Sequence, residues 1–293
     1  MVQILQLNMI PTHPDNRLSW VRSDIEPMFG VRSSRFTAVN SGVCIAIACV
    51  CTVLFYTVLY LMPHHWFVDM FTKRGFTPYP MVFLASWSAA ILFFKWTKIR
   101  LQRRSLDISI LPESTFVLSP NTVDQVLRNI DLMVEQPRHF FLFNRIIGTL
   151  SNLKNIGMIS DVSDILRTHN EQDQEAVETS YSLLYGFLWA IPVLGFVGTV
   201  EGLSVAIGEF GNVLRQSANM EALTSSLQIV TSGLATAFET TLIALVLALF
   251  LHLWSTAMRK AEDDLLLACS EYCSQNIVGH LRMSIRGEDE SGA

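Results

Sequence analysis

The sequence predicts an all-α polytopic membrane protein with four transmembrane helices and with long helices extending into the cytoplasm. Of its 293 residues, 50% are hydrophobic and only 16% are charged. The mean hydropathy of +0.35 is high for a chain whose whole surface faces water. The apolar residues also cluster in four stretches near the roughly 20 residues that a helix needs to cross a bilayer.

The first two predicted membrane helices lie within residues 40–96. The first, Asn40–Met62, carries no charge along its length. The second, Tyr79–Trp96, is shorter and ends in Lys95 and Trp96. These two side chains suit the membrane interface, because a lysine reaches toward water and a tryptophan ring sits well among headgroups.

The third and fourth predicted membrane helices, Tyr181–Phe210 and Leu227–Thr256, lie within residues 180–256. Three further segments are predicted to be cytoplasmic: residues 1–39, a helical domain at 97–179, and a tail at 257–293. In the helical domain, Val123, Val126 and Ile130 recur near the period of an α-helix. The tail is interpreted as the fourth membrane helix continuing out of the bilayer.

The distribution of Lys and Arg predicts the topology. Basic residues are concentrated after the second helix, before the first and after the fourth, which favours the cytoplasm for these flanks. The two short loops on the other side hold few cations, namely Lys73, Arg74 and Arg215. Both termini are therefore expected in the cytoplasm.

Several function classes find no support in the sequence. The net charge of −5 includes no basic block, which argues against nucleic acid as a partner. The five cysteines match no zinc-binding spacing, and the chain has no phosphate-binding glycine loop and no nucleophile elbow. We therefore predict no catalytic centre, no metal site and no cofactor, and expect that the protein is not an enzyme.

Small residues recur every three or four positions in the third and fourth helices. Such spacing places them along one face, where two helices in a membrane can approach closely. The two small faces are expected to meet each other or a shared partner. The predicted packing and coupling residues are Pro192, Gly195, Gly198 and Gly202 in the third helix, and Gly233 and Ala237 in the fourth.

Two glutamates within the third and fourth helices are the most informative polar residues. A charged residue at the bilayer centre costs about 3 kcal/mol on insertion scales. Glu201 and Glu239 are therefore interpreted either as part of an ion path or as a structural pair or neutral acid that holds subunits together. Glu239 lies about 160° around the helix from Thr241, so we expect the acids to point at a neighbouring subunit.

These residues resemble the MotA/TolQ/ExbB proton channel family. The resemblance rests on Pro192 followed by LGFVGT and Gly202, and then, after a short outer loop, on a small-residue helix that carries AFETTL. It is strong over residues 181–254 and elsewhere concerns only the layout. Two helices ahead of the cytoplasmic region are similar to the flagellar stator branch, whereas the GT and TT motifs are closer to TolQ and ExbB.

The resemblance implies a ring of five subunits around a pair of single-helix, MotB/TolR/ExbD-like partner chains, each with an aspartate that binds and releases the ion. It implies that Thr199 and Thr241 line the ion path and that Pro192 shapes the third helix where movement is coupled. The chain would then be the pore-forming subunit of a proton- or sodium-driven rotary motor in the bacterial inner membrane. The remaining ion-path candidates are Thr236, Thr240, Glu201 and Glu239.

Two other functions stay open. A secondary transporter would have two pseudo-symmetric halves and broken helices near the bilayer midplane. The first two helices show no likeness to the last two. A non-conducting assembly scaffold in the membrane is the second alternative.

Overall fold

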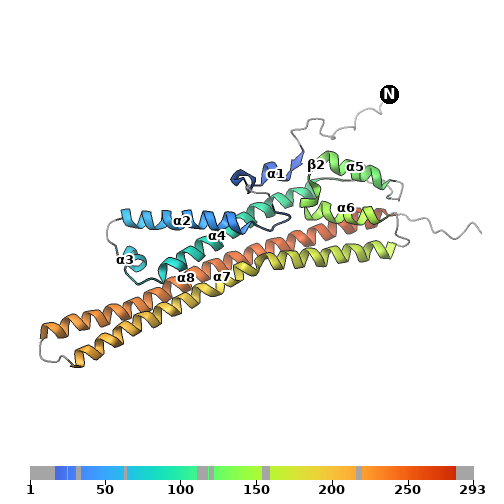
Figure 1. Ribbon diagram of the computed structural model, residues 1–293. Helices are drawn as coiled ribbons and strands as arrows, with labels where there is room; N and C mark the ends of the chain where they lie inside the picture. Colours follow the sequence, from blue (N-terminus) through green and yellow to red (C-terminus); the bar gives the residue numbers. More distant parts are fainter. Residues whose placement is uncertain are drawn as a thin grey trace, which may run out of the picture. The chain divides into compact units, whose positions relative to one another are not determined.

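The predicted all-α membrane fold is confirmed. The structure is a computed structural model that describes residues 17–24, 26–30, 34–62, 65–110, 118, 122–153, 159–215 and 220–281. Four of its helices are long and apolar enough to cross a membrane, judged by length and composition. They are α2 (Ser41–Leu61), α4 (Pro78–Arg103), α7 (Ile159–Arg215) and α8 (Met220–Asn276) (Figure 1).

The chain divides into two compact units. One consists of Asn40–Phe94 and Tyr181–Met258 and is called the membrane unit below. The other consists of Met1–Val39, Lys95–Ser180 and Arg259–Ala293 and is called the terminal unit, because it contains both chain ends.

The membrane unit has an apolar core to which four helices contribute. Helix α2 begins after Asn40, whose side-chain oxygen accepts a hydrogen bond of 2.9 Å from the Gly42 amide. A short helix that the sequence did not predict, α3 (Trp66–Thr72), follows in the connection to α4. The core residues of this cluster are Leu59, Val68, Met70, Phe71, Val82 and Ile243, from α2, α3, α4 and α8.

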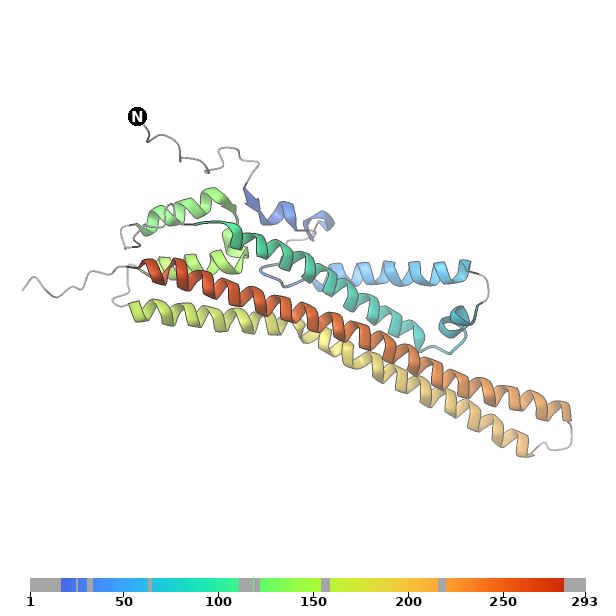
Figure 2. The same ribbon diagram turned by 180° about the vertical axis from the view of Figure 1, so that it is seen from behind.

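Helices α7 and α8 run side by side and extend beyond α3 and the start of α4 (Figures 1 and 2). A Cβ atom built on Gly198 of α7 would lie 2.8 Å from Thr77 Oγ1, so the start of α4 lies at the level of Gly198. Helix α7 ends at Arg215, which is about 25 Å further along its axis. Residues 216–219 of the predicted outer loop lie outside the described residues.

The terminal unit contains the remaining elements. Residues 1–16 of the predicted N-terminal segment and 282–293 of the predicted tail lie outside the described residues. The strands β1 (Leu18–Ser19) and β2 (Val134–Glu135) form a two-stranded parallel pair. The helices are α1 (Trp20–Ser23), α5 (Val123–Met133) and α6 (Phe141–Leu153), with 3-10 turns at Glu26–Phe29, Arg104–Asp107, Pro137–His139 and Val278–His280.

An aromatic contact holds the N-terminal segment in the terminal unit. Trp20 is fully buried, and its ring packs edge-on against Phe140 with a centroid distance of 5.1 Å. The His139 ring lies 5.9 Å from the same tryptophan. Burial lowers the pKa of His139, and the nearby Arg35 guanidinium lowers it further, which favours the neutral imidazole in this packing.

Buried ion pairs are the second feature of the terminal unit. Lys95, which the sequence suggested for the membrane interface, is instead fully buried: its ammonium lies 3.1 Å from Glu262 and donates a 2.8 Å hydrogen bond to Ser180 Oγ. The charge of Lys95 is thus compensated within the protein. Lys98 forms two further buried pairs, with Glu26 at 2.9 Å and with Asp24 at 3.6 Å, and Arg145 forms another with Asp173 at 2.5 Å.

Candidate functional site

The small faces predicted in the third and fourth membrane helices lie against each other in the membrane unit. A Cβ atom on Gly202 would lie 2.5 Å from the carbonyl oxygen of Gly233, and one on Gly233 would lie 2.7 Å from the carbonyl oxygen of Gly202. A Cβ atom on Gly202 would also lie 2.7 Å from the backbone nitrogen of Ala237. Because these neighbours are backbone atoms, the two helix axes can come this close only with glycine at both positions.

The same face continues toward the other end of the helix pair. A Cβ atom on Gly195 would collide with the Ala244 methyl group. Pro192 lies one turn before Gly195 within α7. It has no backbone N–H, so the helix lacks one hydrogen bond there and is locally easier to bend.

Thr240 is buried at the centre of this contact. Its hydroxyl donates a 2.8 Å hydrogen bond to the carbonyl oxygen of Thr236, one turn earlier in α8. A Cβ atom on Gly198 would lie 2.5 Å from Thr240 Oγ1. Thr240 therefore fills the space that Gly198 leaves open between α7, α8 and the start of α4.

Thr199 and Thr241 lie on another side of the helix pair. Thr241 Oγ1 lies 3.1 Å from the carbonyl oxygen of Ala237 and 3.3 Å from that of Gly195 on α7. Thr199 Oγ1 donates a 2.6 Å hydrogen bond to the carbonyl oxygen of Phe196. Both side chains are partly exposed in the single chain.

The orientation of these threonines follows from their positions relative to residues that face α4. Phe187 of α7 packs on Trp87 of α4 with a ring distance of 4.4 Å. Thr199 lies about 120° around α7 from Phe187, and Thr241 lies about 160° around α8 from the core residue Ile243. Both threonines therefore point away from α4.

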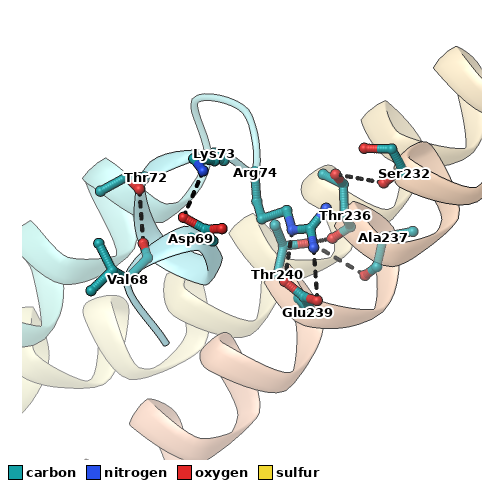
Figure 3. A network of polar contacts seen from close by, with 10 residues as sticks. All are labelled: Val68, Asp69, Thr72, Lys73, Arg74, Ser232, Thr236, Ala237, Glu239 and Thr240. Atoms are coloured by element: carbon teal, nitrogen blue, oxygen red, sulfur yellow. Dashed lines mark hydrogen bonds and ion pairs between the residues drawn. The ribbon is translucent and has the colours of Figure 1, made fainter. Parts of the chain in front are cut away.

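Glu239 is paired within its own chain. Its carboxylate accepts hydrogen bonds of 2.7 Å from Arg74 Nε and 3.0 Å from Arg74 Nη2 (Figure 3). Both side chains are mostly buried, with exposed fractions of 17% for Arg74 and 16% for Glu239. A two-point contact of this kind fixes the direction of the guanidinium as well as its distance. Within the single chain the Glu239 carboxylate thus contacts the α3–α4 loop, and its expected contact with a neighbouring subunit stays a prediction.

Glu201 faces the same loop. A Cβ atom on Gly75 would lie 3.1 Å from the nearer carboxylate oxygen of Glu201. Gly75 has a φ of +79°, a left-handed conformation that glycine adopts without steric cost. Glycine at this position therefore both permits the turn after Arg74 and leaves room for the Glu201 carboxylate.

The structure thus divides the predicted ion-path residues into three sets. Glu201 and Glu239 face the α3–α4 loop, and Thr236 lies about 60° around α8 from Glu239. Thr240 is buried between helices. Thr199 and Thr241 point away from α4 and are partly exposed in the single chain, as is Thr236, whereas the Glu201 side chain is exposed beside the loop.

Sequence reasoning missed the role of Arg74. In the sequence Arg74 is one of two cations in a short loop, although a cation beside two intramembrane acids is a candidate partner for either of them. Its partner lies 165 residues further along the chain, so no local pattern indicated which acid it would contact.

Comparison with protein-family models gave a match to part of the chain. Residues 144–270 match the MotA/TolQ/ExbB proton channel family. This range includes both small faces, both threonines and both glutamates described above. Proteins of this family are membrane-embedded, channel-related proteins that form oligomeric channels with partner proteins. Comparisons with curated proteins and with solved structures gave no significant match.

Proposed function

This chain carries a MotA/TolQ/ExbB proton channel family domain, and from it we propose that the protein is the pore-forming subunit of an ion-driven rotary motor. Five copies form a ring around two single-helix partner chains in the bacterial inner membrane. Each partner chain contributes an aspartate, and protons or sodium ions flowing down their gradient bind to and leave that carboxylate.

The observation that carries this proposal is that Thr199 and Thr241 lie on the same side of the α7–α8 pair, pointing away from α4. In the single chain this side also exposes large apolar side chains, with Phe196 67% and Phe238 68% exposed. Hydroxyl groups beside exposed aromatic rings suit a partner helix better than lipid alone, because the hydroxyls can bind a polar group on that helix. A partner aspartate placed here would lie beside both threonines.

Energy coupling follows from the charge of the partner aspartate. An ion neutralises the carboxylate, which lowers the cost of placing it beside the apolar part of the ring, and the ring then steps to the next subunit. A membrane potential of about 100 mV supplies about 2.3 kcal/mol per charge moved. Pro192, which removes one helical hydrogen bond from α7, is the proposed point where this helix bends during a step.

The set of chain segments that form the terminal unit supports the proposed topology. The N-terminal segment, the connection between α4 and α7, and the segment after Met258 all belong to this one unit. Segments that pack together must lie on the same side of a membrane. Since the connection after α4 carries the densest group of Lys and Arg, we place this side, with both termini, in the cytoplasm.

The proposed role of the Arg74–Glu239 pair is structural. Arg74 compensates the charge of Glu239, which would otherwise be costly at the membrane boundary. The pair also ties the α3–α4 loop to α8, while Glu201 lies beside the same loop. The ion path is therefore assigned to the threonine side of the helix pair and not to the two acids.

Native mass spectrometry of the complex tests this proposal. A tag on the chain is used to isolate it in detergent from the membranes that produce it naturally, so that bound partner chains stay attached. Five copies with two copies of a single-helix, aspartate-bearing chain would support the motor. A monomer or dimer without such a chain would contradict it and would favour a secondary transporter.

A further inference from the structure

A histidine lies in the most apolar part of α8. His252 is the only ionisable residue between Thr240 and Met258, and the stretch from Leu242 to Leu251 before it is entirely apolar. An ionisable side chain within a membrane helix is costly unless it is neutral, paired or in contact with water. The presence of His252 in this apolar stretch therefore needs an explanation of its own, because the roles proposed for the threonines and glutamates do not account for it.

His252 lies on the same side of α8 as Thr241. It follows Thr241 by 11 residues, which places it about 20° around the helix and about 17 Å along the axis from Thr241. It lies about 180° around α8 from Ile243, which is buried in the core that α2, α3 and α4 share with α8. The His252 side chain is exposed in the single chain.

Helix α7 contributes a tyrosine to this side of the pair. Tyr185 precedes Thr199 by 14 residues and lies about 40° around α7 from it. Its ring is 43% exposed and stacks on Tyr181 with a centroid distance of 5.8 Å. Because α7 and α8 are antiparallel and Gly195 meets Ala244, Tyr185 and His252 lie at a similar level.

The charged groups nearest to this side are few. Glu201, Glu239 and Arg74 gather at the α3–α4 loop, and Glu239 lies about 140° around α8 from His252. Arg259 follows His252 by seven residues, about 10 Å further along the same helix. Among the described residues, no ion pair or side-chain hydrogen bond joins an acid to the His252 imidazole.

We propose that His252 carries the transported ion as a proton on the cytoplasmic side of Thr199 and Thr241. This inference rests on the ion path proposed above and extends it. One imidazole nitrogen accepts a proton that arrives along the path and releases it toward the cytoplasm, so the side chain returns to its starting state after each transfer. The 17 Å between Thr241 and His252 exceeds a single hydrogen bond, so water must connect them.

The chemistry of the His252 imidazole favours protons over sodium ions as the transported ion. Imidazole gains and loses protons near neutral pH, whereas hard metal cations bind preferentially to oxygen ligands. A sodium path would be better served at this position by a carboxylate, hydroxyl or carbonyl group. The proposal therefore commits this protein to protons.

Ion flux in liposomes tests the proposal. The complex isolated from its native membranes is reconstituted with a pH-sensitive dye inside the vesicles, and a potassium gradient with valinomycin imposes the membrane potential. We expect His252→Gln, which keeps the size and polarity of the side chain, to lower proton flux about tenfold or more. His252→Glu, which restores a group that exchanges protons, should retain more flux than His252→Gln. His65→Gln in the outer loop, an equivalent change away from α7 and α8, should leave flux unchanged.

Three outcomes would overturn the proposal. Wild-type proton flux in His252→Gln would remove His252 from the path. An equal loss of proton flux in His252→Gln and His252→Glu, with the complex intact, would indicate that His252 acts through packing and not through proton transfer. Sodium flux that does not depend on pH in the wild-type complex would leave the channel in place but remove the proton assignment. A wild-type complex that conducts no ion would instead reject the proposed function itself.

A measurement on the unsubstituted complex avoids any folding defect of a variant. Diethyl pyrocarbonate adds a carbethoxy group to neutral imidazoles that water reaches, and mass spectrometry of peptides locates the addition. We expect modification of His252 in the intact complex in liposomes. Complete protection of His252, with His65 modified in the same sample, would contradict a water-connected proton carrier.

Discussion

Arg74 and Glu239 are joined by two hydrogen bonds of 2.7 and 3.0 Å although 165 residues separate them in the sequence. The pair ties the loop between α3 and α4 to α8. Since Gly75 leaves room for the Glu201 carboxylate beside this loop, the segment from Arg74 to Gly75 contacts both helices of the α7–α8 pair. The loop thus contacts the family-matched helices α7 and α8, although it lies outside the matched residues 144–270.

Replacing Arg74 by Ala should destabilise the protein. The change leaves the Glu239 carboxylate mostly buried and without the guanidinium, at an expected cost of about 1–3 kcal/mol. The double variant Arg74→Ala with Glu239→Gln should recover part of this loss, because the uncompensated charge is gone. Thermal unfolding of the detergent-solubilised protein, measured for both single variants and the double variant, gives the coupling energy.

The pair between Lys73 and Asp69 in the same region provides the matched control. Its charged atoms lie 2.9 Å apart, but the lysine side chain is 57% exposed. Exposed pairs contribute little, so Lys73→Ala should change stability by less than about 0.5 kcal/mol. Equal effects of Arg74→Ala and Lys73→Ala would contradict the structural role assigned to the Arg74–Glu239 pair.

The contact between Gly202 and Gly233 predicts how Gly→Ala substitutions in α7 change the stability of the protein. Gly202→Ala should separate α7 from α8, because the added methyl group meets backbone atoms that cannot rotate away. Gly208→Ala, further along α7 where nothing lies within 4 Å of an added Cβ, should be neutral or slightly stabilising, since alanine favours helix by about 1 kcal/mol over glycine. Melting temperatures in detergent report both. A harmless Gly202→Ala would show that the two helices lie further apart than described.

The buried pair of Lys95 and Glu262 predicts a larger effect in the terminal unit. Glu262→Gln leaves the Lys95 ammonium fully buried without a carboxylate, and the expected cost is about 3–5 kcal/mol. Replacing both residues by Met should recover most of the loss. Arg167→Ala, which removes the exposed pair with Glu171, is the control and should change the free energy of unfolding little. Chemical unfolding followed by circular dichroism measures these differences.

The sequence predicted the helices well because their signals are local. A run such as Asn40–Met62, apolar over its whole length, has few structures available to it other than a membrane helix. The continuation of the membrane helices beyond the bilayer was also predicted, and α7 and α8 each extend over 57 residues. Helix ends were less well predicted: α4 continues to Arg103, beyond the expected end at Trp96.

Features that depend on distant residues were not predictable in the same way. Lys95 lies at the end of an apolar run, where a lysine is expected at the membrane interface. Its actual environment is set by Glu262, which is 167 residues away in sequence. The fully buried Trp20 was not recognised either, because a single tryptophan in a polar segment gives no periodic signal. Contacts of this kind follow from the packing of segments that one sequence does not specify locally.

Thr241→Val separates a conducting channel from a membrane scaffold. Valine has nearly the shape of threonine but no hydroxyl. The close packing of α8 on Gly195 is therefore kept, while the polar group on the proposed ion path is removed together with its 3.3 Å hydrogen bond to the Gly195 carbonyl oxygen. We expect five copies and bound partner chains in native mass spectrometry, together with a loss of most ion flux in liposomes. Thr57→Val on α2 removes an equivalent hydroxyl, which donates a 2.7 Å hydrogen bond to the Val53 carbonyl oxygen away from that path, and a complex with this variant should conduct normally. Because the Thr241 side faces away from the α3–α4 loop, the loss should occur without the instability expected for Arg74→Ala. Unchanged flux in Thr241→Val would exclude this hydroxyl from the ion path, and a wild-type complex that assembles without conducting would favour the scaffold.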